Sequence, residues 1–577
     1  MGDNKNLILA LVLSAMVLFG WSILFPTSTE DLPAEQPVNE QVVPNAGDTV
    51  AANDAAPLPP RSLEDALGGN SRVAIETPRL DGSINLIGGR IDDLTMTDHS
   101  VELDDESGPV RLLSPSRTPD AYFTEFGWTS DGIEVPTSTT RWTSDGEVLT
   151  PQTPVTLSWS NDSGQTFKLI FAVDENYLFT VDQRIENRGP GAVGVGTYAR
   201  ARRAGIDESR TMFNVHNGPM GVFNNEATYD VDYDDLEDEG AQTFSTTGGW
   251  IGFTDKYWLT ALIPSQNTPV RATMQAIKGD GGDVTGYQTD YVGSGMIVEP
   301  GTAKIVESRL FAGAKEKKLL DEYEDAGVQR LSKSIDWGWF EWFMRPIFDL
   351  LRWLFMVTGN FGVAIILLTV LVRLVLYPIA NKQFRSFAGM RRVQPKLKAL
   401  QDRYKDDKPK LQQEMMKLYQ AEKINPLAGC LPILLQIPIF YALYKVLLVS
   451  VEMRHQPFVL WLKDLSAPDP LTPVNLFGLL DFTPPSFIAI GVLPILLGVS
   501  MWLQFKLNPT PVTDPVQKQI FGIMPWVLMV VMAPFAAGLQ LYWVANNILT
   551  LAQQKFFYWR YDKDNPPDVV EAKATKA

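Results

Sequence analysis

Long apolar runs at both ends of this 577-residue chain limit its fold more than any other sequence feature. They cover residues 7–25, 361–377, 427–449, 487–505, 520–534 and 539–557. Most of them approach the roughly 20 residues that an α-helix needs to cross the core of a bilayer. The sequence therefore predicts a polytopic α-helical membrane protein with six transmembrane helices, of which the last five form a common core.

Charged residues are distributed unevenly along the chain outside the first apolar run. Residues 26–340 hold 24 Lys and Arg against 50 Asp and Glu, whereas residues 341–577 hold 25 against 16. The acidic balance therefore belongs to a soluble part of the chain. Residues 27–60 are rich in Pro, Ala, Asn and Gln and contain no Lys or Arg, a composition that cannot bury a core. We expect a disordered, exported tether there.

Apolar residues alternate with polar ones from about residue 62 to residue 312. Val155, Leu157 and Trp159 form one such series, and residues 167–171 and 177–181 form others. Many short strands with this period predict a large β-sandwich. The single cysteine, Cys430, excludes an intrachain disulfide framework. The acidic segment 230–239 has carboxylates for calcium but lacks EF-hand spacing, so we expect an acidic solvated loop.

Aromatic residues gather just before the second apolar run, after a charged stretch, 319–333, that reads as helical. Trp337, Trp339, Trp342 and Trp353 fall here together with several Phe residues. Such a cluster beside a spanning run is typical of an amphipathic helix in the headgroup layer. The alternative is a helix buried under the β-domain.

The charges of the short loops predict the orientation of the chain. Residues 381–425 hold twelve Lys and Arg against five acids, and residues 506–518 hold two against one, so both loops should be cytoplasmic. Residues 452–486 hold two basic and four acidic residues and should lie outside. This pattern places both termini in the cytoplasm and the β-domain outside. No small-x-small cleavage pattern follows residues 7–25, so we expect a retained signal anchor.

The basic loop has a helical order of its own. Apolar residues at 390, 393, 397, 400 and 404 and at 411, 415 and 418 predict two short helices with a heptad seam, which Pro395 should kink. Its candidate recruiting residues are Arg391, Arg392, Lys396, Lys398, Arg403 and Lys405. Such an arm could dock ribosomal RNA or acidic lipid headgroups, or its charge could only fix the topology.

Arg373 is a permanent charge inside an apolar run, which costs roughly 3 kcal/mol or more at a bilayer centre. It could snorkel to the headgroups, or it could sit in a water-accessible groove. Thr369 lies one turn before it on the same helical face. Uncharged polar residues also lie within or beside other runs, and such groups together can line a wet cavity. They are Gln436, Gln540, Asn546, Asn547, Thr550 and Gln553. We favour the groove.

The chain lacks the sequence motifs that several classes of function require. The chain has no GxxxxGK[ST] loop, no catalytic constellation and no Cys-rich or His-rich metal pattern. We therefore predict no enzyme activity, no cofactor and no metal. A transporter or channel using the same polar groove is the alternative function, although the runs contain no Asp or Glu for proton coupling. An anchored carbohydrate-binding or sugar-modifying protein is a third candidate.

A set of local motifs resembles the signature of the YidC/Oxa/Alb membrane protein insertases, in the Gram-negative YidC form. The motifs are NPLAGCLP at 425–432, QIPIF at 436–440, ALY at 442–444, VRL at 372–374, YP at 377–378, PFVLW at 457–461, DLSAPDP at 464–470 and TDP at 513–515. The resemblance implies a membrane protein insertase and chaperone that works alone or with the Sec translocon. It implies nascent membrane proteins and membrane lipids as partners, with the ribosome and the signal-recognition receptor as further candidates.

The resemblance also implies residue roles. Arg373 matches the arginine of the family's hydrophilic groove, and Thr369 and Trp543 match positions that contact a passing client helix. The β-domain resembles the family's periplasmic β-supersandwich, which would place the chain in the bacterial inner membrane. The predicted segments are a signal-anchor helix (1–26), a tether (27–61), the periplasmic β-sandwich domain (62–318), connecting and interfacial amphipathic helices (319–356), transmembrane helix 2 (357–380), the basic cytoplasmic hairpin (381–425), transmembrane helices 3–6 with their loops (426–558) and a cytoplasmic tail (559–577).

Overall fold

The structure is a computed structural model, and it describes most of the chain from residue 60 onward. The described residues are 60–69, 71–103, 107–204, 215–279, 281–338, 340–404, 407–422, 431–480, 482, 485, 489–507 and 515–564, with the backbone alone at 382, 385–388, 390–392, 408, 431–435, 515–518, 520–521, 562 and 564. The chain divides into two compact units, Met1–Asn45 and Ala46–Ala577, and every described residue belongs to the second. The predicted signal anchor and nearly all of the tether therefore lie outside the described residues.

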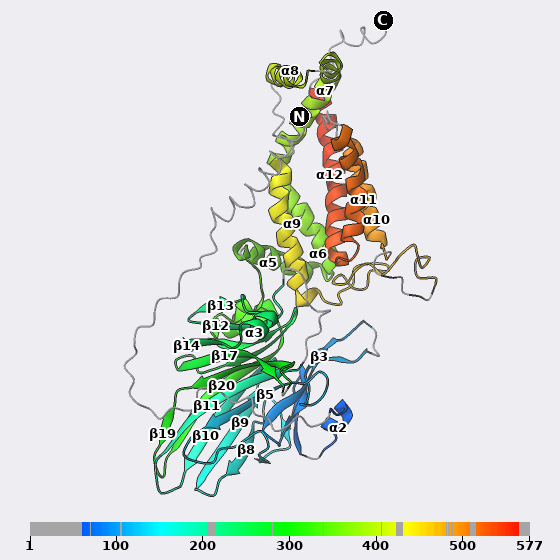
Figure 1. The fold of residues 1–577 in the computed structure, drawn as a ribbon. Helices are drawn as coiled ribbons and strands as arrows, with labels where there is room; N and C mark the ends of the chain where they lie inside the picture. Colours follow the sequence, from blue (N-terminus) through cyan, green and yellow to red (C-terminus); the bar gives the residue numbers. More distant parts are fainter. Residues whose placement is uncertain are drawn as a thin grey trace. The chain divides into compact units, whose positions relative to one another are not determined.

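Two large β-sheets make up the first half of the described chain (Figure 1). Within the described residues one sheet has eleven strands and the other has nine. The path of the first sheet is β14 (Gln242–Thr247), β17 (Pro269–Lys278), β18 (Val284–Gly293), β11 (Val193–Arg203), β5 (Tyr122–Thr129), β3 (Arg90–Ser100), β2 (Leu80–Asn85), β1 (Arg72–Glu76) and β7 (Val148–Leu149), with β19 (Met296–Val298) on β11 and β4 (Pro109–Leu113) on β3. The path of the second is β13 (Glu226–Thr228), β12 (Gly218–Phe223), β15 (Trp250–Thr254), β16 (Trp258–Ile263), β20 (Ala303–Ala314), β10 (Leu178–Asn187), β9 (Gln165–Val173), β8 (Val155–Ser160) and β6 (Thr143–Ser144).

The two sheets pack face to face, as the alternating pattern predicted. Along β9 every second side chain is buried, including Phe167, Leu169 and Phe171. Trp128 of β5 packs edge-on against Phe167, with ring centroids 5.2 Å apart. Contacts of this kind join the inner faces of both sheets into one core, which confirms the prediction of a large β-sandwich.

The acidic segment 230–239 was expected to be a solvated loop. Most of its acids are exposed, as expected, but its centre is helical and not a loop. It forms the short helix α3 (Tyr233–Asp238). Asp232 caps the helix by accepting a hydrogen bond from the backbone N–H of Asp235, whose carboxylate accepts one from the N–H of Asp232. Tyr233 and Leu236 are buried beneath it. The capping box and two buried apolar side chains outweigh the repulsion among the acids.

The second half of the described chain is helical. After the short helix α2 (Leu63–Leu67) near the start of the β-domain, the helices are α4 (Lys317–Asp325), η3 (Leu331–Ser334), α5 (Glu341–Thr358), α6 (Phe361–Val375), α7 (Tyr377–Arg403), α8 (Lys408–Ala421), α9 (Leu431–Val449), η5 (Val451–Met453), α10 (Val492–Leu507), α11 (Pro515–Met532) and α12 (Ala537–Asp564). Figure 1 shows α6, α9, α10, α11 and α12 running side by side. They occupy the five C-terminal apolar runs. The helix expected over 319–333 ends earlier, at Asp325, because Gly327 adopts a positive φ.

A search of the described residues finds no helix that is both long enough and apolar enough to cross a membrane. The six transmembrane helices therefore stay a prediction.

Candidate functional site

A pocket of about 370 Å³ lies between the helices, with walls from α6, α7, α9, α10 and α12. It contains all five residues that the sequence assigned to a groove. These are Thr369, Arg373, Gln436, Trp543 and Asn547. Arg373 is the one charged side chain among the described residues that line it. Among its described lining residues, the pocket therefore combines one positive charge with amide, hydroxyl and apolar groups.

Arg373 is held by polar but uncharged groups of α12. Its Nη2 donates to Asn546 Oδ1 at 2.6 Å and to the backbone oxygen of Asn546 at 3.1 Å, and its Nη1 donates to Gln553 Oε1 at 2.9 Å. Thr550 Oγ1 accepts a further hydrogen bond from Nη2. Within the described chain no carboxylate forms an ion pair with it. These bonds fix the direction of the guanidinium and leave its charge uncompensated.

The other predicted residues meet the pocket in different ways. Gln436 Nε2 donates to Tyr542 Oη at 2.7 Å, and Asn547 Nδ2 donates to Ser500 Oγ at 3.0 Å. Both bonds join α12 to another helix. Trp543 is half-buried and packs against Phe440 at 4.8 Å between ring centroids.

Thr369 is nearly inaccessible, with 1% of its surface exposed. Its hydroxyl donates to the backbone oxygen of Ile365 at 2.7 Å, one turn earlier. Hydroxyls in helices commonly make this bond, which satisfies the donor without a partner from another helix. Thr369 therefore borders the pocket while its donor stays within its own helix.

Local sequence determines how these helices present their polar faces. Asn360 caps α6 by accepting a hydrogen bond from Val363 N–H, which sets the start of the helix. Thr369 and Arg373 then fall on one face because they are four residues apart. Residues 546, 550 and 553 of α12 are four and three residues apart, so they also fall on one face, and they accept the hydrogen bonds from Arg373. The break between α6 and α7 coincides with Pro378 in the first turn of α7.

Tyr542, like Gln383 and Gln504, is a polar residue of the pocket that the sequence analysis missed. The resemblance directed attention to the neighbouring Trp543, whose ring cannot offer a hydroxyl. Tyr542 is 1% exposed and lines the pocket with its hydroxyl bonded to Gln436. The signal available was a tyrosine beside the matched position, four residues before Asn546 and so on the same face of a helix.

The predicted recruiting residues lie on α7 and just beyond it. Lys398 and Arg403 are exposed, and Lys396 forms an ion pair of 2.8 Å with Glu422, which follows α8. Val393 and Leu397 of the expected seam are buried. The side chains of Arg391 and Arg392, and the whole of Lys405, lie outside the described residues. Helix α7 continues through Pro395.

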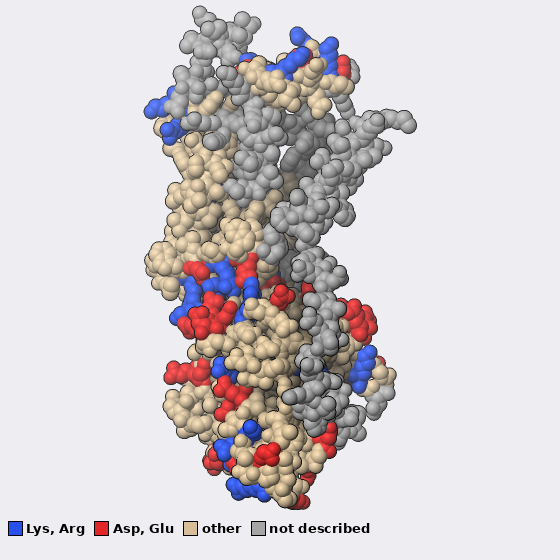
Figure 2. Space-filling model, turned by 90° about the vertical axis from the view of Figure 1, so that its left-hand side faces the viewer, with Lys and Arg blue, Asp and Glu red and all other residues tan. Residues whose placement is uncertain are grey.

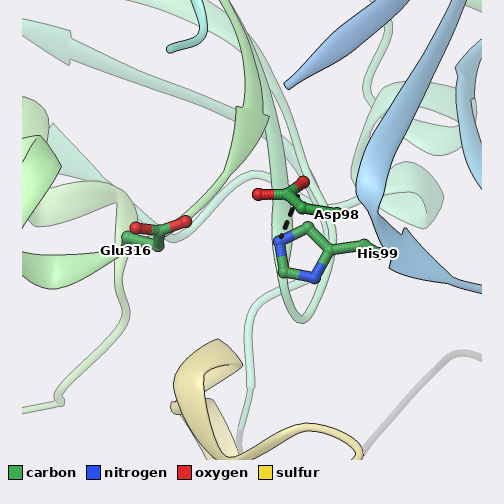
Figure 3. A group of neighbouring side chains, drawn as sticks. All are labelled: Asp98, His99 and Glu316. Atoms are coloured by element: carbon green, nitrogen blue, oxygen red, sulfur yellow. Dashed lines mark ion pairs between the residues drawn. The ribbon is translucent and has the colours of Figure 1, made fainter. Parts of the chain in front are cut away.

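A cluster of Asp98, His99 and Glu316 in the β-domain brings three potential metal ligands within 4.8 Å of one another (Figure 3). Figure 3 shows the imidazole of His99 beside the carboxylate of Asp98. Arg79 forms ion pairs with both carboxylates, at 2.6 Å with Asp98. Because the guanidinium of Arg79 already bonds to both carboxylates, the arrangement is an ion-pair network, and we assign no metal to it.

The family of the chain follows from comparison with known proteins. A family model described as the YidC periplasmic domain matches residues 72–350, and one described as 60Kd inner membrane protein matches residues 353–564. The chain is 44% identical over 565 residues to the membrane protein insertase YidC of Zymomonas mobilis subsp. mobilis, covering 97% of this chain and 96% of that one. It is 43% identical to the protein of the same name from Rhizobium meliloti, covering 96% and 95%.

Solved structures give weaker likenesses. A crystal structure of an active YidC insertase with its first transmembrane domain resolved aligns with a TM-score of 0.36 and 21% identity, covering 84% of this chain and 93% of that one. A galactose mutarotase related enzyme from Lactobacillus acidophilus aligns with a TM-score of 0.29 and 10% identity, covering 42% and 97%. Both scores are too low to support an argument. Sequence identity over nearly the whole length is decisive: the chain belongs to the YidC family of inner-membrane insertases.

Proposed function

We propose that the pocket around Arg373 receives the hydrophilic flank of a client membrane protein while the client enters the inner membrane. The observation that carries this proposal is the bonding of Arg373, whose partners are uncharged amides, a hydroxyl and a backbone oxygen. A carboxylate of the client can therefore add a charge-assisted hydrogen bond without displacing an internal ion pair. Membrane protein insertase is also the name of the relatives, and no chemical reaction is part of that name.

The driving force comes from the client and the bilayer. An apolar client helix that leaves water for lipid gains about 25 cal/mol for each Å² of apolar surface. The membrane potential adds about 2.3 kcal/mol per charge per 100 mV for acidic flanks that move outward. What remains is the barrier for moving a polar flank through hydrocarbon, and a polar pocket lowers that barrier. No nucleotide-binding loop is needed, in agreement with its absence from the sequence.

Each pocket residue has a proposed role in this process. Arg373 holds acidic groups of the flank, and Gln436 and Asn547 offer hydrogen bonds after exchanging their present partners. Thr369 and Trp543 border the route of the client helix. Tyr542 is given the same role as Gln436, because its hydroxyl oxygen accepts the hydrogen bond that Gln436 Nε2 donates.

We further propose six transmembrane helices with both termini in the cytoplasm, the five helices α6 and α9–α12 forming the core. Exposed apolar side chains on α10 and α11 support a lipid-facing surface on these two helices. They include Val499, Trp502, Val527 and Val531. On the face in Figure 2, a wide surface almost without charge separates a zone of Lys and Arg from a band of mixed charge. Helix α5 would lie in the headgroup layer, since Trp342 and Trp353 are exposed.

The basic hairpin of α7 and α8 is proposed to recruit clients on the cytoplasmic side. Its support is the exposure of Lys398 and Arg403 and the excess of basic residues over 381–425. Such charge suits ribosomal RNA, the signal-recognition receptor or acidic lipids. The insertase would work alone or beside the Sec translocon.

Reconstitution tests the function directly. Purified protein in vesicles, with a membrane potential and without nucleotide, is expected to insert a small client with an acidic flank, measured by protease protection of that flank. Empty vesicles serve as the control. Uptake of small solutes by the same vesicles, without client insertion, would instead support the transporter or channel.

A further inference from the structure

A loop between α9 and α10 exposes apolar side chains that nothing in the described chain covers. We name residues 471–480 the apolar loop; they contain no charged residue. Leu479 is 83% exposed, and its exposed apolar neighbours are Val474, Leu476, Phe477 and Leu480. Adjacent large apolar side chains with this exposure are unfavourable in water and mark an interaction surface.

The backbone of the apolar loop is hydrogen-bonded within the loop itself. The N–H groups of Leu476, Phe477 and Leu480 donate to the backbone oxygens of Pro473, Thr472 and Asn475, at 3.1, 2.8 and 3.1 Å. The side chain of Asn475 accepts from Gly478 N–H and from Thr472 Oγ1, at 3.1 and 3.0 Å. These bonds satisfy part of the loop's polar backbone internally, which lowers the cost of placing the loop beside an apolar medium.

Two apolar residues of the loop adopt an unfavourable backbone conformation. Leu476 and Phe477 have φ angles of 50° and 59°, in the left-handed region that favours glycine. The hydrogen bonds around Asn475 hold them there. This conformation turns the chain tightly while both side chains stay exposed. Strained backbone of this kind is found mainly at sites that bind a partner.

A buried carboxylate fixes the base of the apolar loop to the bundle. Asp469 is 4% exposed and accepts hydrogen bonds from Trp461 Nε1 at 2.9 Å, Leu471 N–H at 3.0 Å and Leu493 N–H at 2.7 Å. Val492 N–H donates to the backbone oxygen of Leu471 at 3.1 Å. The loop is therefore held rigidly at the first turn of α10.

This base lies at the periplasmic end of the helices. The periplasmic-domain match ends at residue 350, within α5, and α6 begins soon after it. At the start of α6, Asn360 Nδ2 donates to the backbone oxygen of Phe458, in the same connection as the apolar loop. The loop thus shares this end with the exposed aromatic side chains of α5 and with the start of α10, a helix that exposes Leu496 and Val499.

We propose that the apolar loop inserts its Leu and Phe side chains into the periplasmic leaflet of the inner membrane. Lipid is the occupant that the observations favour, because residues 471–480 carry no charge, expose large apolar side chains and are bonded to the first turn of α10 at the same end of the helices as α5. Together with α5 it anchors the outer end of the bundle. The inference depends on the membrane location of the family and not on the role of the pocket. The proposal for the loop and the proposal for the pocket can therefore fail independently.

Spin-label accessibility tests the proposal in the full-length protein. Replacing Cys430 by alanine leaves no cysteine, after which Leu479→Cys carries a single nitroxide; Asp162→Cys, in an exposed turn of the β-domain, is the matched control. Both are reconstituted in nanodiscs of phosphatidylethanolamine and phosphatidylglycerol. The label at 479 should collide with oxygen more than with a water-soluble nickel chelate, and the label at 162 should show the reverse.

Two results would overturn the proposal. A nickel-chelate accessibility at 479 equal to that at 162 would place the loop in water. Protection from both oxygen and the chelate would indicate cover by protein, either a second copy or a partner. An unchanged melting temperature of both labelled variants shows that the fold is intact.

Discussion

Replacing Arg373 by alanine is expected to slow the insertion of clients with acidic flanks by at least tenfold. Hydrogen bonds to charged groups contribute about 1.5–3 kcal/mol each, and about 1.4 kcal/mol corresponds to a factor of ten in rate. Clients with neutral flanks should lose much less, because they do not use the charge. Insertion rates in proteoliposomes, measured for a client pair that differs only in flank charge, provide the test.

Two further variants separate charge from geometry. Arg373→Lys keeps the charge but loses the planar fork that bonds to Asn546 and Gln553, so it should retain part of the rate. Lys506→Ala removes an exposed cation of α10, outside the pocket, and should change little. Equal losses for neutral and acidic flanks in Arg373→Ala would show that the residue acts only on the structure of the bundle.

The second large effect concerns the stability of the β-domain. Glu125 is 2% exposed, and its carboxylate forms ion pairs with Arg90 at 2.8 Å and Arg200 at 2.7 Å. Glu125→Ala leaves both buried guanidinium groups without this carboxylate, and breaking a buried pair costs about 3–5 kcal/mol. We expect a fall of many degrees in the melting temperature of the domain, measured on the full chain in detergent.

An exposed pair supplies the control for that experiment. Glu307 pairs with Arg309 at 2.8 Å, but its side chain is half exposed, so Glu307→Ala should change stability by at most about 1 kcal/mol. A melting temperature of Glu125→Ala equal to that of Glu307→Ala would mean that the buried network contributes nothing.

The contribution of Glu125 and its two arginines to the stability of the β-domain should fall at low pH. Burial alone would raise the pKa of Glu125, but Arg200 and Arg90 outweigh it and hold the pKa below its usual value. A carboxylate with a lowered folded-state pKa contributes stability above its unfolded pKa of about 4.3, and the contribution is lost as pH falls through the folded value. The stability difference between wild type and Glu125→Ala should therefore shrink on acidification below pH 4.

The sequence predicted the features that depend on local pattern. Period-two alternation located β8, β9 and β10, and the apolar runs located the five C-terminal helices. A charge inside such a run identified Arg373, because its cost demands compensation. Helical spacing from Arg373 added Thr369, the family resemblance added Trp543, and both line the pocket.

The features that the sequence did not predict depend on pairing across the chain. Asn546, Thr550 and Gln553 were expected to help line a cavity, but their hydrogen bonds to Arg373, more than 170 residues earlier in the chain, were not predicted. Nothing local indicates that this face of α12 turns toward α6. Tyr542 was missed for the same reason, since its role rests on Gln436 of α9. The helix at 233–238 was missed because a run of acids is typical of a solvated loop, whereas here Asp232 caps a helix.

Site-specific cross-linking most directly tests the claim that the pocket receives a client's hydrophilic flank. A photoreactive residue replaces Gln436 or Trp543, both of which line the pocket, or Ile548, which is 56% exposed on α12 and does not line it. The client is a ribosome-stalled nascent membrane protein with an acidic flank. Adducts mapped to that flank should form from 436 and 543 and not from 548. Flank adducts that form equally from all three positions, or from 548 alone, would contradict the account.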